Sequence, residues 1–124
     1  MSVTRLSESG LKKLLDGQVE QSPFSVVKFY SNGCHLCKNL SDYYHDIANG
    51  YEDEEGVYFF AFNIEDSEQL KKQLKIDGVP TILTITSNGS IQKPSISILP
   101  EPDRPNPHTW YYAGDIKAFI EKER

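Results

Sequence analysis

The sequence predicts an α/β domain with a central mixed sheet and helices on both faces. Strand-like apolar segments alternate with segments whose apolar residues recur every three or four positions, as in parallel strands joined by helices. The segment from Val57 to Ile64 is apolar almost throughout, which suits a central strand covered on both faces. The dipeptide Asn88-Gly89 predicts a hairpin, with a further, antiparallel strand beginning near Ile91.

The first half of the chain predicts two strand–helix units. Val3 to Leu6 is a short edge strand, and Ser9 to Asp16 is a helix that places three leucines on one face and ends at Gly17. Residues 24–30 form the next strand, and a helix with apolar residues at spacings of three and four follows from about residue 34 to residue 48. Each unit ends in residues typical of a helix stop.

The second half predicts a short helix, two strands and a last helix. Asp66 or Ser67 can cap the short helix, which carries Leu70 and Leu74 on one face. A strand over residues 82–86 precedes the predicted hairpin. The expected element order is therefore β-α-β-α-β-α-β-β-α.

A proline-rich segment interrupts this pattern near the end of the chain. Residues 94–108 contain five of the seven prolines, which predicts a loop or an extended excursion without regular structure. Residues 109–112 can then return the chain to the sheet. Trp110 and Tyr111 either pack against the edge strand or form part of a partner surface. Gly114-Asp115 opens the last helix.

Length and composition limit the possible functions. A chain of 124 residues has the size of one domain, so residues 1–124 are expected to form a single domain and a monomer. The net charge is −5 and the lysines lie among carboxylates, which argues against nucleic-acid and membrane-surface partners. No apolar stretch has the length of a signal peptide or a membrane span, so we expect a cytoplasmic protein.

The two cysteines of the chain, Cys34 and Cys37, lie between a predicted strand and a predicted helix. Unpaired N–H groups at a helix N-terminus carry partial positive charge, which favours thiolate over thiol. The second thiol is close enough to attack a mixed disulfide formed by the first. The bridge would close too small a loop to stabilise the fold much, so the pattern predicts a dithiol redox catalyst.

Two structural explanations of the cysteines remain as alternatives. They could be buried, unreactive thiols, although a helix start is a poor place to bury them. They could also bind zinc, which needs about four ligands. His35, His45 and His108 could supply some of these, but there is no second C-x-x-C and no H-x-x-H motif. No metal is expected.

Four segments resemble the thioredoxin family, and one of them, Val57 to Glu65, is similar to its central strand. Val26 to Lys38 resembles its active-site strand, turn and helix start, Gly78-Val79-Pro80-Thr81 resembles its cis-proline loop, and Tyr112 to Ile120 resembles its closing strand and last helix. The resemblance implies the thioredoxin fold with a proline-rich insertion near the last strand. It also implies that Cys34 is the nucleophile, that Cys37 is the resolving cysteine, and that the pair cycles through a Cys34–Cys37 disulfide.

The resemblance further implies protein disulfide substrates that dock beside the motif. Gly33, Leu36, Val79 and Pro80 are the predicted substrate contacts, with the backbone of Val79 facing an extended substrate strand. A separate reductase or oxidant must reset the pair, because no G-x-G-x-x-G motif for NADPH or flavin exists in the chain. No cofactor is expected.

The sequence departs from the family pattern around the cysteines. Lys28 stands where the family has a buried aspartate, and Ala61 stands where that aspartate has its lysine partner. We expect Lys28 to extend from a strand edge into water and to give Cys37 no base, because a charged lysine accepts no proton. Glu65 is the nearest alternative base by sequence.

His35-Leu36 replaces the family's Gly-Pro between the cysteines. Disulfide isomerases also carry a histidine there, but theirs directly precedes the second cysteine. His35 either faces solvent or, when charged, stabilises the thiolate of Cys34.

The predicted function is thiol–disulfide exchange with proteins through the Cys34–Cys37 dithiol, with the direction of electron flow left open. The alternative is an interaction module that uses residues 94–108 and 110–112 as a partner surface. Loss of the buried aspartate favours the module, whereas the intact C-x-x-C argues against it. A glutaredoxin fits less well, because the motif lacks the Pro-Tyr pair typical of that group.

Overall fold

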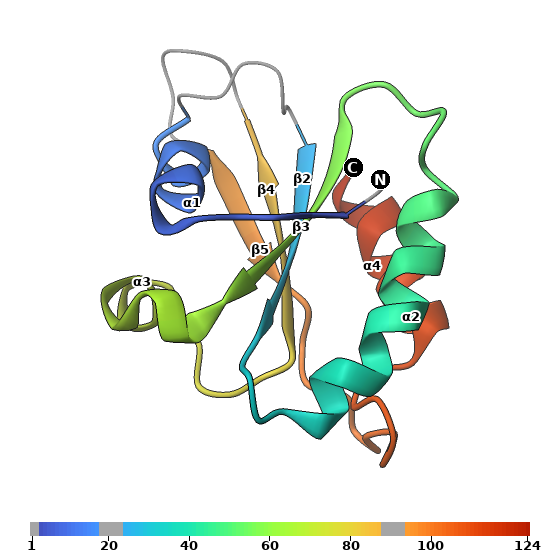
Figure 1. Cartoon of the computed structure of the whole chain (residues 1–124). Helices are drawn as coiled ribbons and strands as arrows, with labels where there is room; N and C mark the ends of the chain where they lie inside the picture. The colour runs from blue at the N-terminus through green and yellow to red at the C-terminus, as the bar shows by residue number, and fades with distance from the viewer. Residues whose placement is uncertain (1–2, 18–23, 88–93) are drawn as a thin grey trace.

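The computed structural model describes residues 3–17, 24–87 and 94–124, which form a five-stranded mixed sheet between two layers of helices (Figure 1). The strands are β1 (Val3–Arg5), β2 (Phe24–Tyr30), β3 (Val57–Asn63), β4 (Thr81–Thr86) and β5 (Ser95–Ile98). Their spatial order is β1-β3-β2-β4-β5. β1 and β2 run parallel to β3, whereas β4 runs antiparallel to β2 and to β5. The predicted fold class is confirmed.

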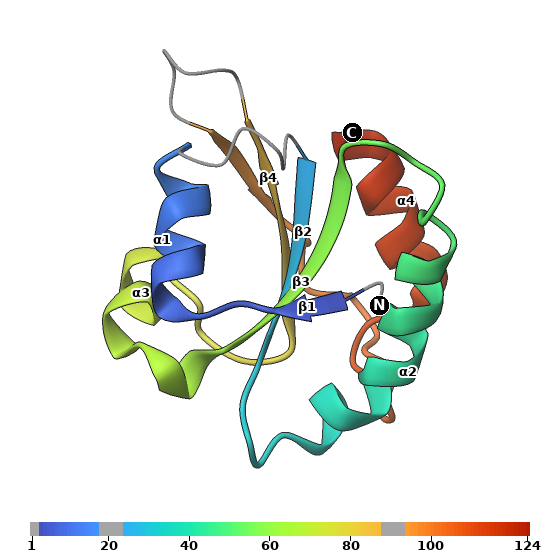
Figure 2. The same cartoon turned by 45° about the horizontal axis from the view of Figure 1, so that its top comes forward.

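Helices cover both faces of the sheet (Figures 1 and 2). The helices are α1 (Glu8–Leu15), α2 (His35–Asn49), α3 (Glu68–Gln73) and α4 (Ala113–Glu123), with a 3-10 turn η1 (Ile64–Asp66) after β3. α2 and α4 lie on one face, and α1 and α3 lie on the other. Each face has its own apolar core, and Leu40, Tyr44 and Ile47 of α2 belong to the first.

β2, rather than β3, is the central strand of the sheet. Six of the seven residues of β2 are buried, whereas only three residues of β3 are. Among the described residues, the outer neighbour β1 pairs with β3 from Phe59 to Ala61, so part of β3 has no strand on that side. The prediction that residues 57–64 form a strand covered on both faces is confirmed, because Phe59 belongs to one apolar core and Phe62 to the other, whereas the central position expected for this strand is taken by β2.

The antiparallel strand predicted after β4 is present as β5, but it lies inside the proline-rich segment, for which the sequence predicted no regular structure. β5 lies within residues 94–108 and pairs with β4 on one side only. An edge strand tolerates nearby prolines because one side of its backbone needs no ladder partner. The hairpin predicted at Asn88-Gly89 and the strand start predicted near Ile91 lie outside the described residues.

Residues 109–112 do not rejoin the sheet. The backbone groups of Trp110 and Asn106 bond to each other at 2.8 and 3.0 Å in an isolated antiparallel bridge. Trp110 has a φ of 67°, and this left-handed residue turns the chain toward α4. The next residue, Tyr111, is 2% exposed and belongs to the core beside α4, so it is not part of an outer surface.

Candidate redox site

The cysteine pair lies where the central strand passes into α2, at the lower end of the sheet in Figure 1. α2 begins at His35, so Cys34 is its N-cap residue and Cys37 lies in its first turn. The two cysteines form a disulfide with Cα atoms 5.2 Å apart. β2 thus delivers both sulfurs to a helix N-terminus, as the residue pattern predicts.

The two sulfurs lie in different surroundings. Cys34 is partly exposed, whereas Cys37 is 3% exposed. The backbone N–H of Cys37 donates a hydrogen bond of 3.0 Å to Cys34 Sγ. A helix N-terminus stabilises negative charge, so the same N–H group favours a thiolate on Cys34 once the disulfide is reduced.

The loop before β4 brings Val79 against the disulfide. The peptide bond between Val79 and Pro80 is cis. The carbonyl oxygen of Val79 lies 3.8 Å from Cys34 Sγ. Among the predicted substrate contacts, Gly33 is exposed, Leu36 and Val79 are half-buried, and Pro80 is buried. Two distant segments therefore meet at the reachable sulfur.

A hydrogen-bond network that the sequence analysis missed holds the turn before Cys34. The backbone N–H of Asn32 donates to Glu65 Oε2 at 2.6 Å, and Asn63 Nδ2 donates to Asn32 Oδ1 at 2.8 Å. The N–H of Glu65 donates in turn to Asn63 Oδ1 at 2.9 Å. Part of this network could have been found in the sequence. Asn32 and Asn63 lie at the ends of two strands, β2 and β3, that are parallel neighbours in this fold class, so their side chains are expected at the same edge of the sheet. Glu65 supports the turn and does not border the cavity beside Cys37 described below.

His35, the third predicted catalytic residue, is exposed on the first turn of α2. Among the hydrogen bonds and ion pairs of the described residues, none joins His35 to Cys34. In residues 3–17, 24–87 and 94–124, no three His, Cys, Asp or Glu side chains gather as metal ligands would. The helices of these same ranges lack the length and apolar character needed to cross a membrane.

Lys28 is buried, and the expectation that it extends from a strand edge into water is wrong. It lies on the central strand and is 5% exposed. Its Nζ lies 5.2 Å from the centroid of the Tyr44 ring and 5.9 Å from that of Tyr30. Its neighbour on β3 is Ala61, which supplies no carboxylate. The strand order, which places β2 in the middle, is the reason for the difference.

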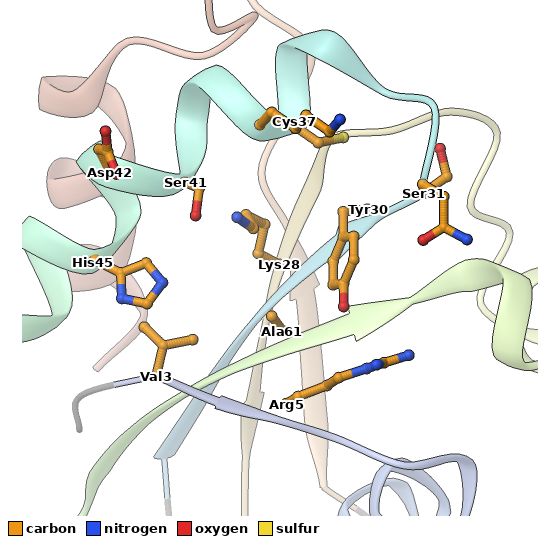
Figure 3. A pocket seen from close by; sticks show the side chains of 12 residues that line it. Val3, Arg5, Lys28, Tyr30, Ser31, Cys37, Ser41, Asp42, His45 and Ala61 are labelled. Carbon is orange, nitrogen blue, oxygen red and sulfur yellow. The ribbon is translucent and has the colours of Figure 1, made fainter.

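Lys28 and Cys37 border the same cavity, which lies between α2 and the sheet and has a volume of about 600 Å³. Figure 3 shows Lys28 extending from β2 toward the helix that carries Cys37 and Ser41. Val3 and Ala61 line the cavity from the neighbouring strands. Burial lowers the pKa of Lys28 from 10.5 to about 8, because the protein displaces water that would solvate the ammonium ion.

The mixed sheet, the helices on both faces and the cysteine pair at the start of α2 define a thioredoxin-fold protein with a redox-type disulfide. The chain belongs to the thioredoxin family, because the model of the Thioredoxin family matches residues 9–98. A cysteine pair at disulfide distance in this family is consistent with thiol–disulfide oxidoreductase activity.

Individual relatives are distant in sequence. The chain is 27% identical to a thioredoxin of Borreliella burgdorferi over 74 residues, which cover 60% of this chain and 59% of that protein. The solved Trx4 domain of ERdj5 has a TM-score of 0.74 at 14% identity, covering 99% of this chain and 96% of that one. The J-Trx1 fragment of ERdj5 has a TM-score of 0.71 at 16% identity, and the match covers 98% of this chain and 51% of that fragment. At these identities the structural likeness shows the fold alone.

Proposed function

We propose that this protein is a thiol–disulfide oxidoreductase that acts on protein disulfides through Cys34 and Cys37. The observation that best supports this proposal is the asymmetry of the disulfide. Cys34 is reachable at the N-cap of α2, and Cys37 is buried directly behind it. A nucleophile at the surface and a resolving thiol beneath it are what the exchange reaction needs. Membership of the thioredoxin family supports the same conclusion.

In the reductive direction, the reduced Cys34 thiolate attacks one sulfur of a substrate disulfide. A Cys34–substrate disulfide forms, and the other substrate sulfur leaves with the bonding pair and takes up a proton. The Cys37 thiolate then attacks Cys34 Sγ, which forms the Cys34–Cys37 disulfide and releases the second substrate thiolate. Two electrons pass from the dithiol to the substrate. The reverse sequence oxidises a substrate, and a separate reductase or oxidant resets the pair.

Substrates dock as extended segments across Cys34 in this proposal. The carbonyl of Val79, 3.8 Å from Cys34 Sγ, is placed to accept an N–H bond from such a segment. A Cβ atom added at Gly33 would meet no atom within 4 Å, so the surface beside the nucleophile is open. Leu36 supplies an apolar contact, and Pro80 acts from beneath by holding the position of Val79.

Reduction of insulin in the presence of dithiothreitol tests the proposal. The protein should accelerate insulin precipitation, and Cys34→Ser should abolish the acceleration. Incubation with a disulfide-containing protein should give a trapped mixed disulfide with Cys37→Ser and none with Cys34→Ser, because only the former keeps the nucleophile while lacking the resolving thiol. The proposal would be refuted if the wild-type protein did not accelerate insulin precipitation and neither variant formed a mixed disulfide with the substrate protein.

The alternative, an interaction module without redox activity, has less support. Its proposed surface includes Tyr111, which is buried in the core. The indole Nε1–H of Trp110 already donates a hydrogen bond of 2.5 Å to Glu101 Oε2 within the same chain. Tyr112 is 42% exposed and remains available for a partner. The insulin assay separates the two functions, since a module without redox activity would not accelerate insulin precipitation. Such a module would still bind its partners after both cysteines are replaced by serine.

A further inference from the structure

We propose that Lys28 is the proton-exchange partner of Cys37, accepting the proton of this thiol before the thiol attacks the mixed disulfide. The lysine would then perform a task for which the cavity offers no buried carboxylate, since Asp42, which also lines it, is exposed. The proposal rests on the proposed function, since it describes how the resolving step of that reaction is made possible.

The first support is that Lys28 is a buried cation without a counterion. No ion pair among the described residues includes it. The rings of Tyr44 and Tyr30 offset part of the lost hydration through cation–π contacts. A buried ammonium ion without an anion is unfavourable, and such groups often exist in part as the neutral amine.

The second support is that reduction of the disulfide creates an acidic group beside Lys28, the thiol of Cys37, which becomes an anion when it loses its proton. Cys37 is 3% exposed, so its thiol has to release a proton within the cavity that it borders. Lys28 and Cys37 border one cavity, across which a proton can move between them without crossing packed protein. The pairs amine–thiol and ammonium–thiolate differ by the position of one proton. Reduction therefore supplies the counterion that Lys28 lacks in the oxidised protein.

The third support is the availability of the neutral amine near neutral pH. With a pKa of about 8, on the order of one Lys28 in ten is neutral at pH 7, whereas an unperturbed lysine would be almost entirely charged. The two groups interact, so the apparent titration steps of the reduced protein belong to the pair.

The other groups around the cavity explain why Lys28 is the better candidate. Arg5 on β1 is paired with Asp66 at 3.1 Å, and the one proton of the Tyr44 hydroxyl is shared between the carbonyl oxygens of Phe60 at 2.7 Å and Val26 at 3.0 Å. The remaining titratable groups that line the cavity are Tyr30, Lys38, Asp42 and His45. Lys38, Asp42 and His45 are exposed on α2, whereas Lys28, which lines the same cavity, is buried.

In the mixed disulfide, the proton of the Cys37 thiol passes to the amine of Lys28, which becomes ammonium. The Cys37 thiolate attacks Cys34 Sγ, the Cys34–Cys37 bond forms, and the bond from Cys34 to the substrate sulfur breaks. The substrate sulfur leaves with the bonding pair and is protonated by Lys28 or by solvent. No cofactor is needed, because the substrate disulfide is the oxidant.

The resolving step can be measured with an aromatic disulfide reagent such as 5,5′-dithiobis(2-nitrobenzoate). Reduced protein releases one coloured thiolate when Cys34 attacks and a second when Cys37 resolves, and stopped-flow absorbance separates the two. The rate of the second release should be compared over pH for wild type, Lys28→Met and Lys28→Arg. Lys38→Met is the control, since it removes an exposed lysine that lines the same cavity.

Lys28→Met and Lys28→Arg should both slow the second release at pH 7 by about tenfold or more, since neither side chain can accept the proton. Their rates should keep rising with pH, whereas the wild-type rate should level off earlier. Lys38→Met should behave as wild type. A Lys28→Arg protein as fast as wild type would show that charge alone matters and would overturn the proposal, as would a fast Lys28→Met protein.

A second measurement is independent of any substrate. Titration of the Lys28 side chain by NMR should differ between the oxidised and reduced protein, because a Cys37 thiol or thiolate is present only in the latter. Identical titrations would overturn the proposal even if the protein reduces insulin. If insulin reduction fails while the two titrations differ, the proposed function is wrong and the coupling of Lys28 to Cys37 stands.

Discussion

The two sides of the disulfide differ in how they relate to the thioredoxin family. On the outer side, Cys34, Gly33 and Val79 present an open surface of the kind the family motif implies. On the inner side, Cys37 borders a cavity whose buried charge is the ammonium of Lys28, where the family has an aspartate. The outer side preserves the family pattern, and the inner side reverses its charge.

This difference separates two requirements of thiol–disulfide exchange. In the proposed reaction, recognition and attack depend on the outer side, which offers a helix N-terminus and the backbone carbonyl of Val79. Resolution depends on proton transfer at a buried thiol, which needs a titratable group but not a particular one. In the mechanism proposed above, a lysine whose pKa is lowered to about 8 by burial meets this need.

The largest expected effect is a change in the free energy of unfolding when Lys28, the buried lysine on the inner side, is replaced. Lys28→Met should stabilise the oxidised protein at pH 7 by up to about 3 kcal/mol, because the native state no longer holds an uncompensated buried charge. The folded-state pKa of about 8 lies below the unfolded value of 10.5, so the penalty is present below pH 8 and disappears as the pH rises toward 10.5.

Urea unfolding of both proteins at pH 7 and at about pH 10 measures this difference. The advantage of Lys28→Met should shrink at the higher pH, and Lys38→Met should show little change at either. A Lys28→Met protein that is less stable than wild type at pH 7 would mean that the packing of the lysine stem outweighs its charge.

The next effect compares the two sulfurs directly. In the reduced protein, limited iodoacetamide should modify Cys34 faster than Cys37 by about tenfold or more, because Cys34 is partly exposed at the helix start and Cys37 is 3% exposed. Mass spectrometry of peptides after brief labelling measures the ratio. Equal labelling, or preference for Cys37, would invert the assignment of nucleophile and resolving cysteine.

A smaller effect should follow from placing a carboxylate on the inner side. Ala61→Asp positions it beside Lys28, its paired residue on the neighbouring strand. The ion pair should raise the pKa of Lys28 above about 8 and slow the resolving step at pH 7 several-fold, because less neutral amine remains.

Ala61→Asn is the matched control, since it has similar size without the charge. The stopped-flow release assay and the NMR titration of Lys28 report both effects. If Ala61→Asp resolves faster than Ala61→Asn, the carboxylate itself has become the base.

The smallest effect concerns His35 on the outer side. A charged His35 would stabilise the Cys34 thiolate and the reduced state, so His35→Gln should make the pair a weaker oxidant. For an exposed group the contribution is about 1 kcal/mol at most, or roughly 20 mV for this two-electron couple. Equilibration of both proteins with glutathione buffers measures the potentials. An unchanged potential would leave His35 without a role in tuning the thiolate.

Local sequence patterns predicted most of the outer side. Contacts between residues close in the chain determine the order of strands and helices along the sequence and the position of Cys34 at a helix start. They also determine the N-cap at Ser67, whose side chain accepts a hydrogen bond of 3.1 Å from the N–H of Leu70. Such contacts are decided by periodicity and capping, which can be recognised in the sequence. The approach of Val79 to Cys34 came from the family resemblance, not from a local pattern.

Only the tertiary structure decided the inner side. The burial of Lys28, its pairing with Ala61 and the cavity it shares with Cys37 depend on the order of strands in the sheet, which places β2 at the centre. The same holds for the network of Asn32, Asn63 and Glu65 and for the bridge at Trp110. A lysine in a strand carries no local sign of whether that strand is central or peripheral, because its solvation is set by neighbours distant in sequence.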